Sequence, residues 1–193
     1  MALLVPVILG SVRAERQGIK AAEFIIARLR ERGHQPVLVD PLELDLPLLD
    51  KMYKEYPRGE APEKLERLAD LYRRADGFMI VSAEYNHSIP SALKNTLDYF
   101  LEEYFYRPSS IVCYSAGRFG GVRAAVALRP ILAEMGMPSL PSILAIPSIG
   151  KALNEDGTST EDWIDTSAAK FLDEFEWYAT ALKAKREADG VPG

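Results

Sequence analysis

Cysteine and histidine are scarce in this sequence. Its 193 residues include one cysteine, Cys113, and two histidines. A single cysteine cannot form a disulfide within the chain, so a reducing, cytoplasmic compartment is expected. The hydrolase motifs G-x-S-x-G and H-E-x-x-H are both absent, and no metal site is predicted.

Long apolar runs and an excess of basic charge are missing too. No stretch of about 18 apolar residues occurs, so no membrane span is predicted. Residues 1–10 are apolar but have neither a basic region nor an A-x-A cleavage site, and we predict a first strand there rather than a signal peptide. The formal net charge of −5 argues against a dedicated nucleic-acid binder.

What remains is the composition of an ordinary globular protein, with 48% hydrophobic and 26% charged residues. A chain of this length buries roughly 70% of its extended-chain surface and needs no disulfide or metal to stay folded. The chain is long enough for one domain with a full hydrophobic core and too short for two such domains. We therefore predict a single domain over residues 1–193.

Short apolar runs alternate along the chain with longer amphipathic segments. The apolar runs are predicted as strands, namely Leu3–Leu9, Pro36–Asp40, Gly77–Ser82, Ser109–Ser115 and Ser142–Pro147. The amphipathic segments are predicted as helices, namely Ile19–Arg32, Glu63–Arg74, one from Pro90 past Tyr99, Val122–Met135 and a C-terminal helix at about 161–187. Residues 41–62 and 148–160 are predicted as loops. This alternation indicates an α/β fold with a parallel sheet covered on both faces, which binds ligands beyond the carboxyl ends of its strands.

The turn after the first predicted strand, residues 10–18, has the composition of an anion site. Ser11, Arg13 and Arg16 supply a hydroxyl and two guanidinium groups, and the following helix start supplies backbone N–H groups. Neither G-x-G-x-x-G nor G-x-x-x-x-G-K-[ST] is present, so a terminal monophosphate fits better than a pyrophosphate or triphosphate. An ordinary polar turn with solvated arginines is the alternative.

Two further turns follow other strands. In residues 82–90, Ser88 and Pro90 are explained by helix capping. The residues between them and the strand, Glu84, Tyr85, Asn86 and His87, are not explained in this way and suit the polar edge of a flat heteroaromatic ring. Residues 115–121 contain three glycines, which permit positive φ and close approach of the backbone to a ligand. Because each turn follows a different strand of one sheet, we expect all three to border the same crevice.

These turns carry three motifs: Gly10-Ser11-x-Arg13, Glu84-Tyr85-Asn86-x-Ser88-x-Pro90 and Ser115-x-Gly117-x-x-Gly120-Gly121. In them the sequence resembles the NADPH-dependent FMN reductase family, which includes azobenzene, quinone and chromate reductases. The resemblance extends from Leu3 to about Phe175. It implies a flavodoxin-like three-layer sandwich, a five-stranded parallel sheet in the order 2-1-3-4-5, and FMN bound across the strand ends.

The resemblance also implies roles for individual residues. The FMN phosphate and the adjoining ribityl chain would contact Ser11, Arg13, Arg16, Gln17 and Gly18. The isoalloxazine would be lined by Glu84, Tyr85, Asn86 and His87 on one side and approached by Ser115, Gly117 and Gly120 on the other. NADPH or NADH would reduce the flavin, which would pass the electrons to a small-molecule acceptor such as a flavin, quinone or azo compound in a ping-pong cycle. Hydride transfer to flavin N5 needs no acid or base, so no catalytic residue is predicted.

Three matters stay open in the sequence. The segments Tyr99–Leu101 and Tyr104–Tyr106 hold more aromatic residues than one helix face buries easily, and we expect some of them at the interface of a homodimer or tetramer, since homodimers are usual in the resembled family. Arg107, Arg118 and Arg123 are candidates to meet the 2′-phosphate of NADPH. A flavin-binding electron carrier or redox sensor, and a flavin-free ligand-binding or interaction module, are the alternative functions.

Overall fold

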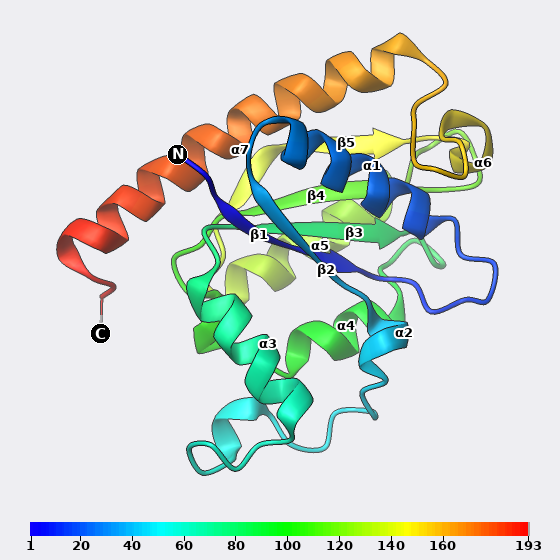
Figure 1. Cartoon of the computed structure of the whole chain (residues 1–193). Helices are drawn as coiled ribbons and strands as arrows, with labels where there is room; N and C mark the ends of the chain where they lie inside the picture. The colour runs from blue at the N-terminus through cyan, green and yellow to red at the C-terminus, as the bar shows by residue number, and fades with distance from the viewer. Residues whose placement is uncertain (193) are drawn as a thin grey trace.

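A computed structural model describes residues 1–192 and contains one five-stranded parallel sheet (Figure 1). In spatial order the strands are β2 (Gln35–Val39), β1 (Leu4–Leu9), β3 (Phe78–Ala83), β4 (Ser109–Tyr114) and β5 (Ser139–Ile146). All neighbouring strands pair in parallel. The predicted order 2-1-3-4-5 and the flavodoxin-like arrangement are confirmed.

Helices cover both faces of this sheet. One face carries α1 (Gly18–Glu31) and α7 (Asp162–Asp189), and the other carries α3 (Glu63–Arg74), α4 (Ser91–Asp98) and α5 (Val122–Glu134) (Figure 1). Every residue of β3 and β4 is buried, which explains why the apolar residues of these central strands are consecutive (Phe78–Val81 and Ile111–Tyr114) rather than alternating with polar ones. None of the helices within residues 1–192 is long and apolar enough to cross a membrane.

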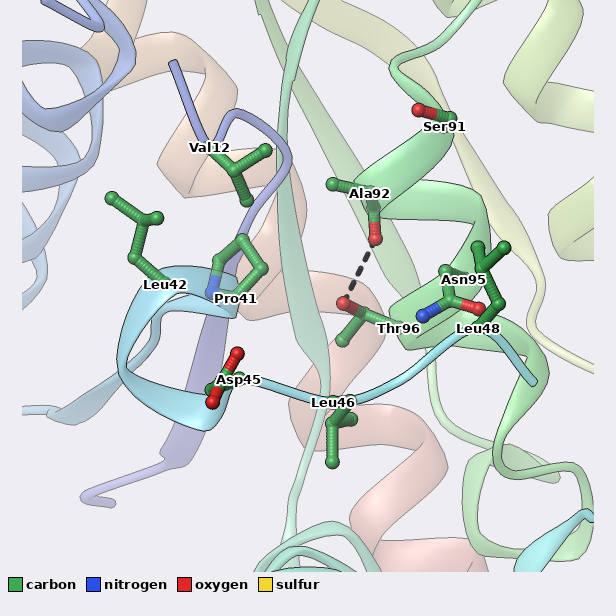
Figure 2. Close-up of a pocket in the computed structure, with 10 residues that line it drawn as sticks. All are labelled: Val12, Pro41, Leu42, Asp45, Leu46, Leu48, Ser91, Ala92, Asn95 and Thr96. Carbon is green, nitrogen blue, oxygen red and sulfur yellow. Dashed lines mark hydrogen bonds between the residues drawn. The ribbon is translucent and has the colours of Figure 1, made fainter. Parts of the chain in front are cut away.

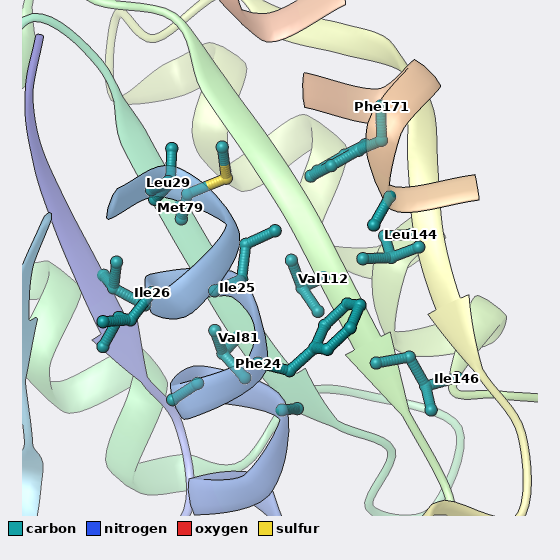
Figure 3. Packing of buried hydrophobic residues seen from close by; sticks show 14 of the residues in the cluster. Phe24, Ile25, Ile26, Leu29, Met79, Val81, Val112, Leu144, Ile146 and Phe171 are labelled. Carbon is teal, nitrogen blue, oxygen red and sulfur yellow. The ribbon is translucent and has the colours of Figure 1, made fainter. Parts of the chain in front are cut away.

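The core under α1 and α7 shows how the helical spacing is used. Phe24, Ile25 and Leu29 of α1 point onto the sheet, and Phe171 of α7 packs from the same side (Figure 3). All four side chains are buried. Full burial of a side chain of this size contributes roughly 1.5–3 kcal/mol each. This face therefore holds α1, and the turn that precedes it, firmly against the strand ends.

The predicted boundaries agree with the structure to within two residues except at two places. Strand β5 begins at Ser139, three residues before the predicted Ser142, because the prolines Pro138 and Pro141 mask the strand pattern. Pro141 is exposed on β5, at the edge of the sheet, where a missing N–H is tolerated. Helix α4 ends at Asp98 instead of passing Tyr99, and a short 3-10 turn, η2 (Glu102–Tyr104), follows it.

The aromatic segment after α4 is mostly core. Tyr99, Phe100 and Tyr104 are 4%, 1% and 0% exposed, whereas Tyr106 is 38% exposed. The bend at the end of α4 brings two of the buried rings against Tyr72 of α3, whose ring lies 5.0 Å from Phe100 and 5.2 Å from Tyr104. The Tyr99 hydroxyl instead donates to the carbonyl of Pro47 at 2.9 Å. The core therefore takes three of these aromatic residues, and a subunit interface formed by the rest stays a prediction.

The two predicted loops contain short helices. Residues 41–62 hold α2 (Pro41–Leu44) and the 3-10 turn η1 (Tyr53–Glu55), and residues 148–160 hold α6 (Ile149–Ala152). The side chain of Asp40 caps α2 by accepting a hydrogen bond from the N–H of Leu42 at 2.9 Å. Both stretches leave the carboxyl end of a strand, so their first residues lie beside the turns singled out in the sequence.

Candidate functional site

The three turns meet at one surface cavity of about 240 Å³ at the carboxyl ends of β1, β3 and β4. We call it the strand-end cavity. Its lining comprises Ser11, Arg13, Glu15, Arg16, Gln17, Ala83, Glu84, Tyr85, Tyr114, Ser115, Ala116 and Ile149. Of the predicted site residues, those from Ser11 to Gln17, Glu84, Tyr85 and Ser115 line it together. The expected convergence of the three turns is thus what the fold produces.

The first turn presents groups that suit an anion. Ser11 is buried, and its Oγ lies 2.9 Å from the hydroxyl of Tyr85 in the second turn. Arg13 is exposed and forms no ion pair within residues 1–192. Helix α1 begins beside it with Gln17 at the N-cap, where no side chain caps the helix and no acidic residue stands in the first turn. The first N–H groups of α1 and the Arg13 guanidinium are therefore available to an anion.

Arg16 is occupied differently from Arg13. Its guanidinium makes a two-pronged contact with the carboxylate of Asp40, with Nη1 at 2.6 Å from Oδ1 and Nη2 against Oδ2. Nη1 also donates to the carbonyl oxygen of Ser11 at 3.0 Å. The side chains of Arg16 and Asp40 are only 13% and 3% exposed. In this arrangement Arg16 ties the first turn to the end of β2.

Gly18 and Tyr114 are in close contact at the start of α1. A Cβ at residue 18 would lie 2.8 Å from Cζ of Tyr114 and closer still to its hydroxyl oxygen. Burial raises the pKa of Tyr114, and the guanidinium groups of Arg16 and Arg13 act in the opposite direction. The Tyr114 hydroxyl therefore stays protonated and can serve as a donor in the cavity. Gly18 itself is buried behind the lining.

The second turn is a tight two-residue hairpin. Tyr85 and Ser88 exchange backbone hydrogen bonds of 2.9 and 3.0 Å, and the two residues between them, Asn86 and His87, have φ values of 50° and 65°. Positive φ at both central positions is the geometry of a type I′ turn, in which asparagine is common and histidine is rare. Asn86 and His87 are exposed and lie outside the cavity lining, on the rim.

Glu84 connects the second turn to the third. Its Oε2 accepts a hydrogen bond from the backbone N–H of Arg123 at 3.2 Å, and its Oε1 lies 3.1 Å from Nη1 of the same residue. The carboxylate thus caps α5 and neutralises the Arg123 guanidinium. Burial, and secondarily the charge of Glu84, raises the pKa of the Cys113 thiol to about 12. Cys113 is therefore an unreactive core residue.

The third turn is folded by its glycines and by hydrogen bonds to α6. Gly121 has a φ of 79°, and a Cβ there would lie 2.7 Å from the carbonyl oxygen of Tyr114. The N–H groups of Ser148 and Ile149 donate to the carbonyls of Gly117 and Ser115 at 2.9 and 3.1 Å. Gly117 is exposed with open space around it and Gly120 is buried, and neither of these two predicted residues is part of the cavity lining.

Several lining residues were not predicted from the sequence. Tyr114 follows Ile111, Val112 and Cys113, and its hydroxyl at the carboxyl end of that strand is a signal that marks it in retrospect. Ile149 comes from α6, which was predicted as loop. Glu15, Ala83 and Ala116 are neighbours of predicted residues and carry no separate signal.

A second cavity of about 340 Å³ lies on the other side of the first turn. Val12 lines it, whereas its neighbours Ser11 and Arg13 line the strand-end cavity. Figure 2 shows Val12 and Leu42 across from Ala92 of α4, and Leu48 also lines this cavity. The first turn therefore forms the wall between a polar cavity and a largely aliphatic one.

Known proteins resemble this chain over most of its length. The sequence model of the family described as NADPH-dependent FMN reductase matches residues 3–151. A quinone reductase of Pseudomonas putida is 32% identical over 178 residues, which are 89% of this chain and 91% of that protein. An NADPH azoreductase of a Bacillus species is 28% identical over 101 residues, about half of each protein, at 52% of this chain and 55% of that one.

A solved structure shares the fold. FerB of Paracoccus denitrificans, described as a flavoenzyme NAD(P)H:(acceptor) oxidoreductase, superposes with a TM-score of 0.71 at 23% identity, covering 92% of this chain and 99% of its own. The family match includes all three turns of the strand-end cavity as well as the sheet beneath them. The resemblance first seen in the turn motifs thus holds for the whole sheet, and the chain belongs to the NADPH-dependent FMN reductase family of oxidoreductases.

Proposed function

We propose that this chain binds FMN in the strand-end cavity and transfers electrons from NADPH or NADH to a small-molecule acceptor. The observation that carries the proposal is the first turn, where the unpaired Arg13, the buried hydroxyl of Ser11 and the uncapped start of α1 stand together. A terminal phosphate needs this combination of cation, hydroxyl and backbone N–H groups. The family to which the chain belongs uses flavin and NAD(P)H.

The residues of the cavity fit FMN. Arg13, Ser11 and the first N–H groups of α1 would hold the phosphate, and Gln17 would meet the adjoining ribityl hydroxyls. The open space at Gly117 and the polar wall formed by Glu84 and Tyr85 leave room for a flat ring between the second and third turns. When bound, FMN supplies the redox chemistry, taking a hydride from the nicotinamide and giving electrons to the acceptor in a ping-pong cycle.

The protein groups around the cavity would hold the turns in place and orient the bound ligand, and they would not exchange protons with it. Arg16 and Glu84 each hold one turn by an ion pair, with Asp40 and Arg123 respectively. Tyr114 keeps its proton and remains a hydrogen-bond donor. Fixed donors of this kind stabilise negative charge that develops on a bound ring without reorganising. No residue of the lining is assigned as a general acid or base.

An absorption spectrum of the purified protein tests the proposal, recorded before and after addition of FMN and then anaerobically with NADPH. A flavin spectrum that bleaches with NADPH supports the reductase. A flavin spectrum that stays oxidised would favour an electron carrier or sensor, and absence of flavin after reconstitution would favour the flavin-free module. Arg13→Ala should weaken FMN binding by about tenfold or more, since it removes a charge-assisted contact. Arg58→Ala, an exposed arginine remote from the cavity lining, is the matched control.

Self-association and a cytoplasmic location complete the proposal. Exposed aliphatic side chains gather at the second cavity, with Val12, Leu42 and Leu48 being 43%, 47% and 84% exposed. They offer a homodimer better apolar contacts than the buried aromatic segment after α4 does. A monomer mass by sedimentation at micromolar concentration would contradict the dimer. A reducing compartment suits Cys113, because the sequence contains no second cysteine with which it could form a disulfide.

A further inference from the structure

Two of the arginines near the strand-end cavity are already paired with carboxylates. Arg16 is held by Asp40, and Arg123 is held by Glu84. Arg107 lies before β4, at the amino end of the sheet, and donates to the carbonyls of Ala75 and Phe105 at 2.8 Å each. Arg107 is therefore no longer a candidate to bind the 2′-phosphate of NADPH.

Two arginines in the turns around the cavity have no such partner. Arg13 and Arg118 are both exposed and form no ion pair in the part of the chain that the structure describes. Arg13 belongs to the first turn and Arg118 to the third, two residues beyond Ala116 of the lining. One phosphomonoester, that of FMN, accounts for Arg13. The second unpaired guanidinium indicates a second anionic group on a second ligand.

Arg118 is also held in place. Its guanidinium carbon lies 5.0 Å from the ring centroid of Phe119, and that of Arg123 lies 4.6 Å from the same centroid. Phe119 is half exposed and packs against these two cations at the rim. Stacking on an aromatic ring restricts an arginine side chain while leaving its N–H fork free for a phosphate.

We infer that Arg118, stacked on Phe119, binds the 2′-phosphate of NADPH and makes this chain prefer NADPH over NADH. The inference rests on the proposed function, because it assigns the electron donor of the same site. The 2′-phosphate is a terminal dianion that NADH lacks, and a planar guanidinium fork matches its oxygens. Arg123 contributes less, since Glu84 neutralises it.

A binding experiment that needs no turnover tests the inference. Calorimetric titrations of the FMN-loaded protein with 2′,5′-ADP (adenosine 2′,5′-bisphosphate) and with 5′-AMP, which differ only in the 2′-phosphate, measure the contribution of that phosphate alone. We expect 2′,5′-ADP to bind about tenfold more tightly, as one charge-assisted contact of about 1.4 kcal/mol produces. Arg118→Gln should abolish the difference, and Phe119→Leu should reduce it. Lys151→Gln is the matched control, because Lys151 is another exposed and unpaired cation close to Ile149 of the lining.

Steady-state kinetics give the second readout. Arg118→Gln should raise KM for NADPH about tenfold and leave KM for NADH and both kcat values unchanged. An equal loss for both nucleotides, an unchanged preference, or the same effect from Lys151→Gln would overturn the inference. Failure of the proposed function has a different signature, namely a protein that binds no FMN or is not reduced, and the titrations then repeated on the flavin-free protein still decide whether Arg118 recognises the 2′-phosphate.

Discussion

Replacement of Asp40 by asparagine tests whether Arg16 braces the first turn or contacts phosphate directly. Asp40 accepts from Nη1 of Arg16 at 2.6 Å, contacts Nη2 with its other oxygen, and caps α2 through the N–H of Leu42 at 2.9 Å. Asp40→Asn keeps the shape of the side chain and its capping oxygen. It removes the charge and places an amide against the guanidinium, leaving a buried cation without its counter-ion.

The expected loss follows from the burial of the pair. Removing one member of a buried ion pair costs about 3–5 kcal/mol. The side chains are 13% and 3% exposed, and Arg16 keeps its bond to the carbonyl of Ser11 at 3.0 Å, so the lower end of that range applies. For a domain of this length a loss of about 3 kcal/mol lowers the melting temperature by roughly 6–12 °C.

Thermal unfolding and FMN titration are the two assays. The double variant Arg16→Met with Asp40→Leu removes both charges and should be more stable than Asp40→Asn, since no unpaired ion is left buried. If Arg16 braces the turn, Asp40→Asn also weakens FMN binding. If Arg16 contacts the phosphate directly, Asp40→Asn frees the cation and FMN binding is unchanged or tighter. An unchanged melting temperature in Asp40→Asn would refute the reasoning about the pair.

Three further outcomes are expected. Gly18→Ala should destabilise the protein by about 1–3 kcal/mol in denaturant unfolding, because the new Cβ would lie 2.8 Å from Cζ of Tyr114, and adding Tyr114→Phe should restore part of the loss. The pKa of Cys113 is raised from 9.0 to about 12, so its contribution is fully present below pH 9 and lost as the pH rises toward 12, and the stability of Cys113→Ala should fall less steeply over that range. Lys183→Gln removes an ion pair of 2.8 Å with Asp76 and should speed amide exchange in the last turns of α7, which unchanged exchange rates would contradict.

Most of the fold could be predicted from the sequence because the patterns that indicate its helices and strands are local. Helical spacing in α1 and α3, and consecutive apolar residues within β3 and β4, are set by residues close to one another in the chain. The errors occur where a contact with a residue far away in the sequence determines the local structure. Helix α4 stops at Asp98 because the following rings turn into the core against Tyr72, which lies in another helix. No periodicity within residues 90–106 could have indicated that bend.

The sequence predicted which turns form the site, but it did not predict the partners of the side chains within them. The turn at residues 10–18 was expected to offer both Arg13 and Arg16 to a phosphate, yet the partner of Arg16 is Asp40, 24 positions further on. Likewise the partner of Glu84 is Arg123, 39 positions away. Pairings at this separation depend on the sheet order, which determines the turns and strand ends that become neighbours.

A count of arginines therefore overstates the positive charge that a ligand meets. Five arginines were candidates for phosphate groups, and the structure neutralises Arg16 and Arg123 with carboxylates and directs Arg107 to backbone carbonyls. A paired guanidinium has already exchanged its water for protein and gains little from a second anion, whereas an unpaired, exposed one loses only water on binding. The charges that select ligands here are consequently those of Arg13 and Arg118, one in each of two turns that flank the same cavity. Because each of these two turns offers one unpaired guanidinium, we expect one turn to bind the phosphate of FMN and the other to bind the phosphate of a separate nucleotide.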